Sequence, residues 1–469
     1  MAPADGVTPA GAKEFMMKFE DCCTKNNNRF KRRKLALLPY QIMLSDFQRS
    51  AKLPNGIHCP KIGVYAGKGT SHSWLWFIEL FEKFGFFNVL CLDENQVANG
   101  ALENLNVFAV SGGDTFAIAQ GLGEEGASAI RKFMLAGGLY IGACAGSYLP
   151  MNSSKSPLNL FNFAKVKIAN LTKLLPPAIQ LSHKLSTPYG CQYVYHPVRE
   201  AVNLRASGKP PFFNISSFNA PLYGGPSMIP ENPEWILAFY SGFTPKTQFL
   251  VDQGIATEVL LGKAAALRVP WGRGFFYLFG PHFEHPGFPI ANKILAEIIH
   301  YEIGTISSEH VRPLLKPIKS IEGQEASNFI KNIKRELSNA RIVAVALELM
   351  PLRWQIGSKF YEPQKFRVFL EAIWKHLSIL DRKQTIHLRT DQKSEMISTA
   401  KKICRLLREL KSAADKSQKT DTTATIILES LQHFSRMFFN LFFLTLFLSA
   451  HAQNARTRID REFIHADCA

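Results

Sequence analysis

Cysteine is scarce in this 469-residue chain, and its eight residues follow no pattern. The absence of CxxC and of paired Cys/His spacing excludes a disulfide scaffold and a structural zinc site. We therefore expect reduced thiols, no metal, and an intracellular, cytoplasmic protein. The N-terminus lacks an apolar secretory segment, and Glu14, Glu20 and Asp21 argue against an acid-poor transit peptide.

No apolar run has the length of a membrane-spanning helix. The most apolar stretch, MFFNLFFLTLFLSA (437–450), has about 14 residues, whereas a spanning helix needs roughly 20. Extension upstream meets Glu429 and Arg436. Three roles are favoured for this stretch: a buried core helix, an interfacial segment that gives peripheral membrane contact, or a helix that binds a protein partner. A full membrane span is a fourth, less favoured role.

Basic residues clearly outnumber acidic residues at the two ends of the chain. Residues 1–60 hold 10 Lys/Arg against 5 Asp/Glu, and residues 305–469 hold 27 against 17. Residues 61–304 are close to neutral, which disfavours nucleic acid as a partner of this middle part. The basic ends fit a membrane surface, RNA or an acidic partner, although solvated polar faces are the simpler interpretation.

The length exceeds one ordinary core and indicates several domains. Residues 1–55 form a basic N-terminal extension, with helices expected near 12–23 and 35–50. The turn-rich LPNGIHCP (53–60) marks a boundary. We assign residues 56–304 to one domain and residues 305–469 to a basic, mainly helical C-terminal region, with one strand expected at 341–349.

Short apolar runs alternate with helical patterns from residue 61 onward. The runs lie at 61–67, 87–93, 105–114 and 139–146, and helices are expected at 71–86, with Ser71 as N-cap, and at 117–138. This alternation predicts an α/β fold with a mostly parallel, doubly wound sheet. Residues 233–242 and 256–280 predict antiparallel additions with a hairpin turn at Gly272-Arg273-Gly274. An irregular insertion, 150–230, is expected over the strand ends, and a helix at 290–303 closes the domain.

The turn GACAG (142–146) gives Cys144 two interpretations. A nucleophile on a sharp strand-to-helix turn needs small neighbours, and Gly142, Ala143, Ala145 and Gly146 meet that need. Backbone N–H groups at the helix start would lower the thiol pKa and stabilise an oxyanion. A free cysteine is equally a small residue suited to a buried, tight space.

The stretch FGPHFEHP (279–286) supplies the partners that a thiol nucleophile needs. His282 and Glu284 lie two residues apart, so they share one side of an extended segment. His282 is the expected base and Glu284 the acid that orients it. His285 is expected to point away from this pair.

These motifs carry a family resemblance. VYAGKGT, FAVSGGD, the Cys144 turn, YGGP (223–226) and the His282-x-Glu284 stretch resemble class I glutamine amidotransferase-like proteins. The resemblance is narrower to the amidotransferase-like N-terminal domain of biotin–protein ligases and its stand-alone relatives, and it covers about 61–304. It implies a flavodoxin-like fold and a catalytic set of Cys144, His282 and Glu284. It also implies an oxyanion hole formed by Gly112, Gly113 and Ala145. The substrate pocket that it implies contains Tyr65, Asp114, Gly224 and Gly225.

The resemblance implies a cysteine-dependent hydrolase that acts on an amide or related carbonyl, with glutamine as the default substrate. Biotin ligase activity is not supported, because no ligase half follows. The chain departs from the amidotransferase-like pattern at His282-Phe283-Glu284, where that family commonly has His-Pro-Glu. No cofactor is expected, since GKGTS (67–71) does not satisfy the phosphate-loop pattern. His72 and Cys191 are assigned core or loop roles. The alternative function is a catalytically silent regulatory or binding module, with 305–469 as a docking arm for a protein partner.

Overall fold

The computed structural model describes residues 60–177, 179–180, 193–212, 215–304, 314, 319–357, 359–383, 385–388 and 392–466, with side chains up to residue 451. Residues 58–469 belong to one compact unit, in which the α/β region and the C-terminal helices pack together. The predicted N-terminal extension with its two helices, and Cys191, lie outside the described residues.

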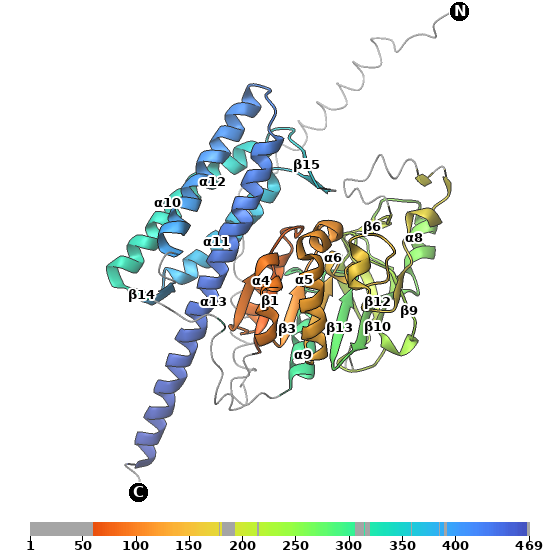
Figure 1. Cartoon of the computed structure of the whole chain (residues 1–469), viewed down its shortest axis with the longest axis horizontal. Coiled ribbons are helices and arrows are strands. Elements are labelled where there is room, and N and C mark those ends of the chain that lie inside the picture. The colour runs from red at the N-terminus through yellow and green to blue at the C-terminus, as the bar shows by residue number, and fades with distance from the viewer. Residues whose placement is uncertain are drawn as a thin grey trace, which may run out of the picture. The chain divides into compact units, whose positions relative to one another are not determined.

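The alternating runs fold into an 11-stranded mixed sheet with a mostly parallel core (Figure 1). Its first strands are β1 (Ile62–Tyr65), β2 (Val89–Leu92), β3 (Val107–Val110) and β4 (Leu139–Ala143). They pair in the order β2-β1-β3-β4 and continue to β13 (Gly274–Phe279), with every pairing parallel. The carboxyl ends of these strands therefore meet at one edge of the sheet.

Antiparallel strands extend this core beyond β13. They follow in the order β12 (Ala264–Trp271), β10 (Ile236–Phe243), β7 (Ala201–Ala206) and β8 (Ser217–Pro221). The predicted hairpin turn is confirmed, because Trp271 pairs with Gly274 and Gly272 has a φ of 60°. The shorter strands are β5 (Val166–Ile168), β6 (Val198–Arg199), β9 (Met228–Pro230) and β11 (Gln248–Phe249).

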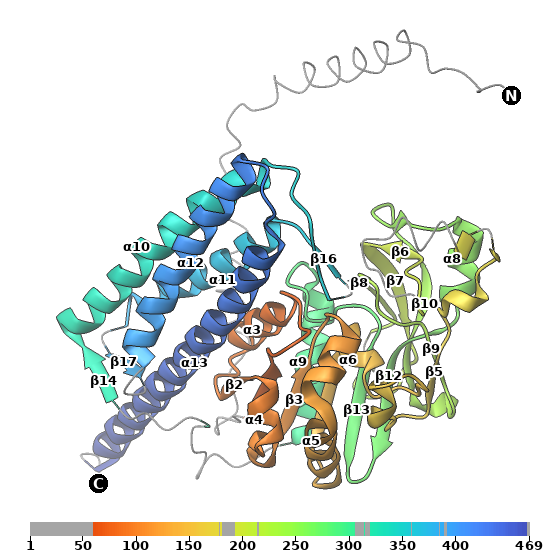
Figure 2. The same cartoon turned by 45° about the horizontal axis from the view of Figure 1, so that its top comes forward.

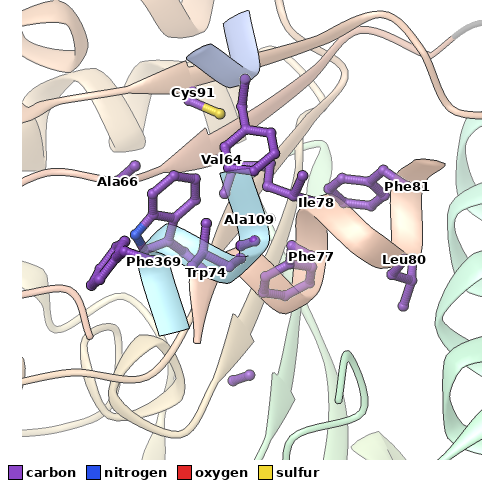
Figure 3. Close-up of a cluster of buried hydrophobic side chains, with 14 of the residues drawn as sticks. Val64, Ala66, Trp74, Phe77, Ile78, Leu80, Phe81, Cys91, Ala109 and Phe369 are labelled. Atoms are coloured by element: carbon purple, nitrogen blue, oxygen red, sulfur yellow. The ribbon is translucent and has the colours of Figure 1, made fainter. Parts of the chain in front are cut away.

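Helices cover both faces of the sheet because strand side chains alternate in direction. Helices α3 (Trp74–Lys83) and α9 (Pro289–Ile303) pack on the face that carries Val64 and Ala109 (Figure 3). Helix α5 (Thr115–Leu135) packs on the opposite face. The remaining helical elements of this region are α4 (Glu94–Ala98), α6 (Ala145–Tyr148), α8 (Gln253–Leu260), η1 (Ala101–Asn104), η2 (Leu158–Phe161), η3 (Thr172–Leu174) and η4 (Pro233–Trp235).

Two local predictions in this region are wrong. Residues 256–260, predicted as strand, belong to α8, because the Asp252 side chain caps the N–H groups of Gly254 and Ile255 and starts a helix. Ser71 does not cap α3. The N-cap position is Ser73, whose side chain makes no capping hydrogen bond. The Ser71 hydroxyl accepts from the Ser73 N–H at 3.3 Å, one residue before the helix begins, and both hydroxyls also lie against the Gly112 carbonyl.

The C-terminal region is mainly helical, as predicted. Its elements are β14 (Lys319–Glu322), α10 (Gly323–Glu348), β15 (Trp354–Ile356), β16 (Lys359–Tyr361), α11 (Gln364–Leu380), β17 (Thr385–Leu388), α12 (Gln392–Asp415) and α13 (Asp421–Ala466). The predicted strand at 341–349 is wrong, because these residues end α10. Ala340, Ala344 and Leu347 are buried at helical spacing, while the β-branched Ile342 and Val345 are exposed.

Helix α13 contains the apolar stretch 437–450 and packs against α11, α12 and the edge strand β2 (Figure 2). The Asn440 side chain meets this edge, with Oδ1 accepting from the Cys91 N–H at 2.7 Å and Nδ2 donating to the Cys91 carbonyl at 3.1 Å. Residues 421–451 have the length and composition of a membrane span, and 61% of their most apolar window is buried within the protein. The stretch thus packs here as a core helix.

Candidate functional site

Cys144 stands on a strained turn between β4 and α6. Its φ of 52° and ψ of −109° are rarely adopted by residues other than glycine. The small neighbours have a steric reason, since a β-carbon on Gly142 would strike the Gly146 carbonyl and one on Gly146 would strike the Val110 carbonyl. The turn therefore holds the thiol at the carboxyl edge of the sheet, in the geometry of a nucleophile turn.

His282 and Glu284 are fixed by a tight turn rather than by the extended segment that the sequence suggested. The His285 N–H donates to the His282 carbonyl at 3.2 Å, and the His282 N–H donates to the Pro221 carbonyl at 2.9 Å. Phe283 turns into the core and stacks on Phe279 at a centroid distance of 4.4 Å. This turn brings His282 Nδ1 to 2.7 Å from Glu284 Oε1.

A hydrogen-bonded chain runs through the buried site. Nδ1 of His282 is held by Glu284, and the imidazole acts on the Cys144 thiol by hydrogen bonding and charge, which lower the pKa of the thiol. Cys144 Sγ also lies 3.8 Å from the Tyr223 carbonyl oxygen. The Ser111 hydroxyl donates to Glu284 Oε1 at 2.9 Å and lies 2.8 Å from the Ser73 hydroxyl. Cys144, His282 and Glu284 are respectively 4%, 2% and 0% exposed, so the interactions of this chain are poorly screened by solvent.

The surroundings of the thiol favour its charged form. Burial by itself raises the pKa of Cys144, but the hydrogen bond and charge of His282 and the charge of Lys359 outweigh it and lower the pKa. Burial lowers the pKa of His282, and the Glu284 carboxylate with Cys144 raises it to about 10. The pair is thus stabilised as thiolate and imidazolium, the reactive state of a cysteine nucleophile.

Gly113 and Ala145, two residues of the predicted oxyanion hole, line the same cavity as Cys144. The N–H groups of Gly113 and Ala145 have no hydrogen-bond partner among the residues described. Gly112 has a different role, because a β-carbon there would lie 2.8 Å from His282 Cε1. Its lack of a side chain makes room for the imidazole ring.

A cavity of about 340 Å³ opens onto Cys144. Gly113, Asp114, Ala145 and Gly224 line it with residues of the 150–230 insertion, which covers the strand ends as predicted. Two predicted pocket residues do not line it. Tyr65 is fully buried in the α5-side core and donates its hydroxyl to the Lys68 carbonyl, while Gly225 packs against the Gly280 backbone.

Several residues near the site were not predicted. The Trp76 ring lies 5.1 Å from the His282 ring and 4.5 Å from the His285 ring, so His285 packs beside the site instead of pointing away. Ser111 precedes Gly112 at the end of β3, and this position was its sequence signal. Lys359 lines the cavity from β16, and its position in the sequence, 215 residues beyond Cys144, gave no such signal.

Other groups in the described part of the chain offer weaker chemistry. A cavity of about 670 Å³ between η1 and α5 has neither cysteine nor histidine among the residues that line it. The described residues contain no cluster of His, Cys, Asp and Glu suited to a metal ion. His72 stacks edge-to-face on Trp76, and burial and nearby positive charges lower its pKa. Cys144 with its cavity is therefore the candidate site.

One segment of the chain matches a known protein family. Residues 61–156 match the family model described as the N-terminal domain of biotin-protein ligase. This segment contains Cys144, Asp114 and the residues of the predicted oxyanion hole, and it ends before His282. No curated protein sequence matches the chain.

Solved structures give only distant likenesses. A ThuA-like protein from Bacteroides uniformis has 13% identity and a TM-score of 0.33, over 56% of this chain and 99% of that protein. A β-galactosidase from Bacillus circulans sp. alkalophilus has 13% identity and a TM-score of 0.30, over 56% of this chain. This chain spans 33% of the length of that β-galactosidase. At these TM-scores the likenesses carry no argument about function.

Proposed function

We propose that this protein is a cysteine-dependent amidohydrolase or amidotransferase-like enzyme, with Cys144 as nucleophile, His282 as base and then acid, and Glu284 as orienting group. The observation that carries the proposal is the buried thiol–imidazole–carboxylate chain on a strained turn. A merely structural cysteine gains nothing from a partner that lowers its pKa. The contrast within this chain is Cys91, a buried thiol whose pKa burial raises strongly.

The proposed reaction has two stages. The Cys144 thiolate attacks the carbonyl carbon of an amide, and the N–H groups of Gly113 and Ala145 hold the resulting oxyanion. Collapse breaks the carbon–nitrogen bond, the leaving amine takes a proton from the His282 imidazolium, and a thioester remains. Water then gives its proton to His282, its oxygen attacks the thioester carbonyl, and the acid and the thiolate are released.

The finer classification of the fold is part of this proposal. The order β2-β1-β3-β4-β13, parallel throughout, supports a flavodoxin-like, doubly wound, class I amidotransferase-like domain. The candidate site lies at the carboxyl ends of these strands, where such sheets bind ligands. The match over residues 61–156 supports the same family. Glutamine is the default substrate to test.

The test is selective labelling of Cys144. We expect a diazoketone analogue of glutamine to form one adduct at neutral pH, located on Cys144 by peptide mass spectrometry. The matched variant Cys91→Ala should be labelled as the wild type is, and Cys144→Ala should lose the adduct and any release of ammonia from glutamine. Folded wild-type protein whose Cys144 reacts no faster than a free peptide thiol would show the proposal to be wrong.

A ligand-binding module is the second candidate, because the C-terminal region contributes Lys359 to the same cavity. In that case 305–469 would dock a protein partner, and membrane contact through 437–450 would belong to the same class of role. Labelling of Cys144 without turnover of any amide, together with loss of a co-purifying partner in Lys359→Gln protein, would favour this candidate.

A further inference from the structure

The β15–β16 hairpin extends from the C-terminal helices toward the α/β region (Figures 1 and 2), and its residue Lys359 lines the Cys144 cavity. Its base is anchored by Trp354, which is 1% exposed, stacks on Phe366 and donates its indole N–H to the Thr420 hydroxyl at 2.9 Å. Its turn contains Gly357, with a φ of 63°, where a β-carbon would lie 3.2 Å from Asp114 Oδ2. The tip therefore sits against the first residue after the Gly112-Gly113 loop.

Lys359, the first residue of β16, is the single C-terminal residue among the described residues that line the Cys144 cavity. Its side chain is half-buried, and its charge contributes to the lowered pKa of Cys144. The fold thus brings a cation from the helical region into the cavity of the proposed nucleophile. The cavity is incomplete without this region.

Positive charge dominates the cavity. Its charged lining residues are Lys155, Lys173, Lys359 and Asp114. The Asp114 carboxylate is already engaged at the start of α5, where Oδ1 accepts from the N–H groups of Phe116 and Ala117. No other carboxylate belongs to the described lining, so three lysines face a single carboxylate in this cavity. A cavity of this charge attracts anions.

We propose that Lys359, with Lys155 and Lys173, binds a carboxylate on the substrate of Cys144, so that the C-terminal region sets specificity for an amide that carries net negative charge. This inference rests on the proposed function. It predicts that the preferred substrate carries net negative charge, which distinguishes it from zwitterionic glutamine. Lys359 is then a specificity-determining residue and not part of the bond-breaking machinery.

The experiment compares two alkylating probes that differ chiefly in charge. Iodoacetate is anionic and iodoacetamide is neutral, so the ratio of their rates at Cys144, divided by the same ratio for N-acetylcysteine, isolates the effect of charge from the reactivity of the thiol. We expect a normalised ratio of about 10 or more in the wild type, because the attraction between opposite unit charges about 4 Å apart near a protein surface exceeds the energy that corresponds to a factor of ten. Lys359→Gln should lower it by most of that factor, and Lys359→Arg should keep it.

The matched control is Lys375→Gln, which removes a lysine of the same region that pairs with Glu79 at 3.3 Å and does not line the cavity. Its ratio should equal that of the wild type. A normalised ratio near one in the wild type, or a ratio unchanged by Lys359→Gln, would overturn the anion site while leaving iodoacetamide reactivity, and hence the proposed function, intact.

If neither probe reacts with Cys144, the proposed function fails, and the anion site is decided by equilibrium binding. Glutarate should raise the Tm of Cys144→Ala protein in a concentration-dependent way, whereas the neutral diamide glutaramide should not. Glutarate should lose this effect in the Cys144→Ala, Lys359→Gln double variant. Absence of a glutarate effect in Cys144→Ala protein would overturn the anion site.

Discussion

Replacement of Glu284 by glutamine tests whether the buried carboxylate sets the charge state of the site. The side chain keeps its shape, and it loses the negative charge that lies 2.7 Å from His282 Nδ1. Two unit charges about 4 Å apart interact by about 4 kcal/mol at an effective dielectric constant of about 20. Since the glutamine side chain still forms a hydrogen bond with the ring, we expect the pKa of His282 to fall by only about 1–3 units.

The sign of the pH effect follows from this loss. In the wild type the pKa of His282 is raised to about 10 and that of Cys144 is lowered, so the thiolate persists below the ordinary cysteine pKa. Without the Glu284 charge the imidazolium is less stable, which weakens the hydrogen bond and charge that lower the pKa of Cys144. The direct repulsion between Glu284 and the thiolate is also lost, but it is the smallest of the contributions to this pKa, so the pKa of Cys144 rises toward its ordinary value. Because each pKa unit is a factor of ten in population, alkylation at about pH 6 should slow by about 10- to 1,000-fold.

The assay is the rate of Cys144 alkylation by iodoacetamide from about pH 5 to about pH 9. The matched control is Glu302→Gln, which removes another carboxylate of the same domain. Glu302 pairs with Arg268 at 2.6 Å and accepts from the Tyr277 hydroxyl, and neither partner belongs to the proposed catalytic set. The Glu302→Gln profile should superimpose on that of the wild type. A Glu284→Gln profile that also superimposes, in folded protein, would refute the electrostatic role of Glu284.

Two further variants test the packing around the site and between the regions. Gly112→Ala places a methyl group 2.8 Å from His282 Cε1, which should displace the imidazole ring. The rate of Cys144 alkylation near neutral pH should then fall by at least about tenfold. An unchanged rate would contradict the steric role of Gly112. Asn440→Leu removes both hydrogen bonds to the Cys91 backbone and leaves that N–H and carbonyl buried and unpaired, so the free energy of unfolding in urea should fall by about 2–4 kcal/mol. A loss below about 0.5 kcal/mol would mean that water replaces the amide at this edge.

The sequence by itself determined the elements whose signals are local. Apolar runs of strand length and glycines beside Cys144 predicted β1 to β4 and the tight turn, because both depend on neighbours a few residues away. Local signals also misled: the β-branched residues at 341–349 suggested a strand, and only burial of the Ala340, Ala344 and Leu347 face shows why the segment is a helix.

Only the tertiary structure decided how the site is assembled. The Ser111 hydroxyl reaches Glu284 across 173 residues of sequence, and the fold brings Lys359 into the cavity of Cys144. Burial then determines how strongly these charged groups change the pKa of Cys144, since a carboxylate or an imidazole shifts the pKa of a neighbour strongly only where water is excluded. The sequence names the residues capable of this chemistry. The packing of the C-terminal helices against the sheet determines which of them meet and in which charge state.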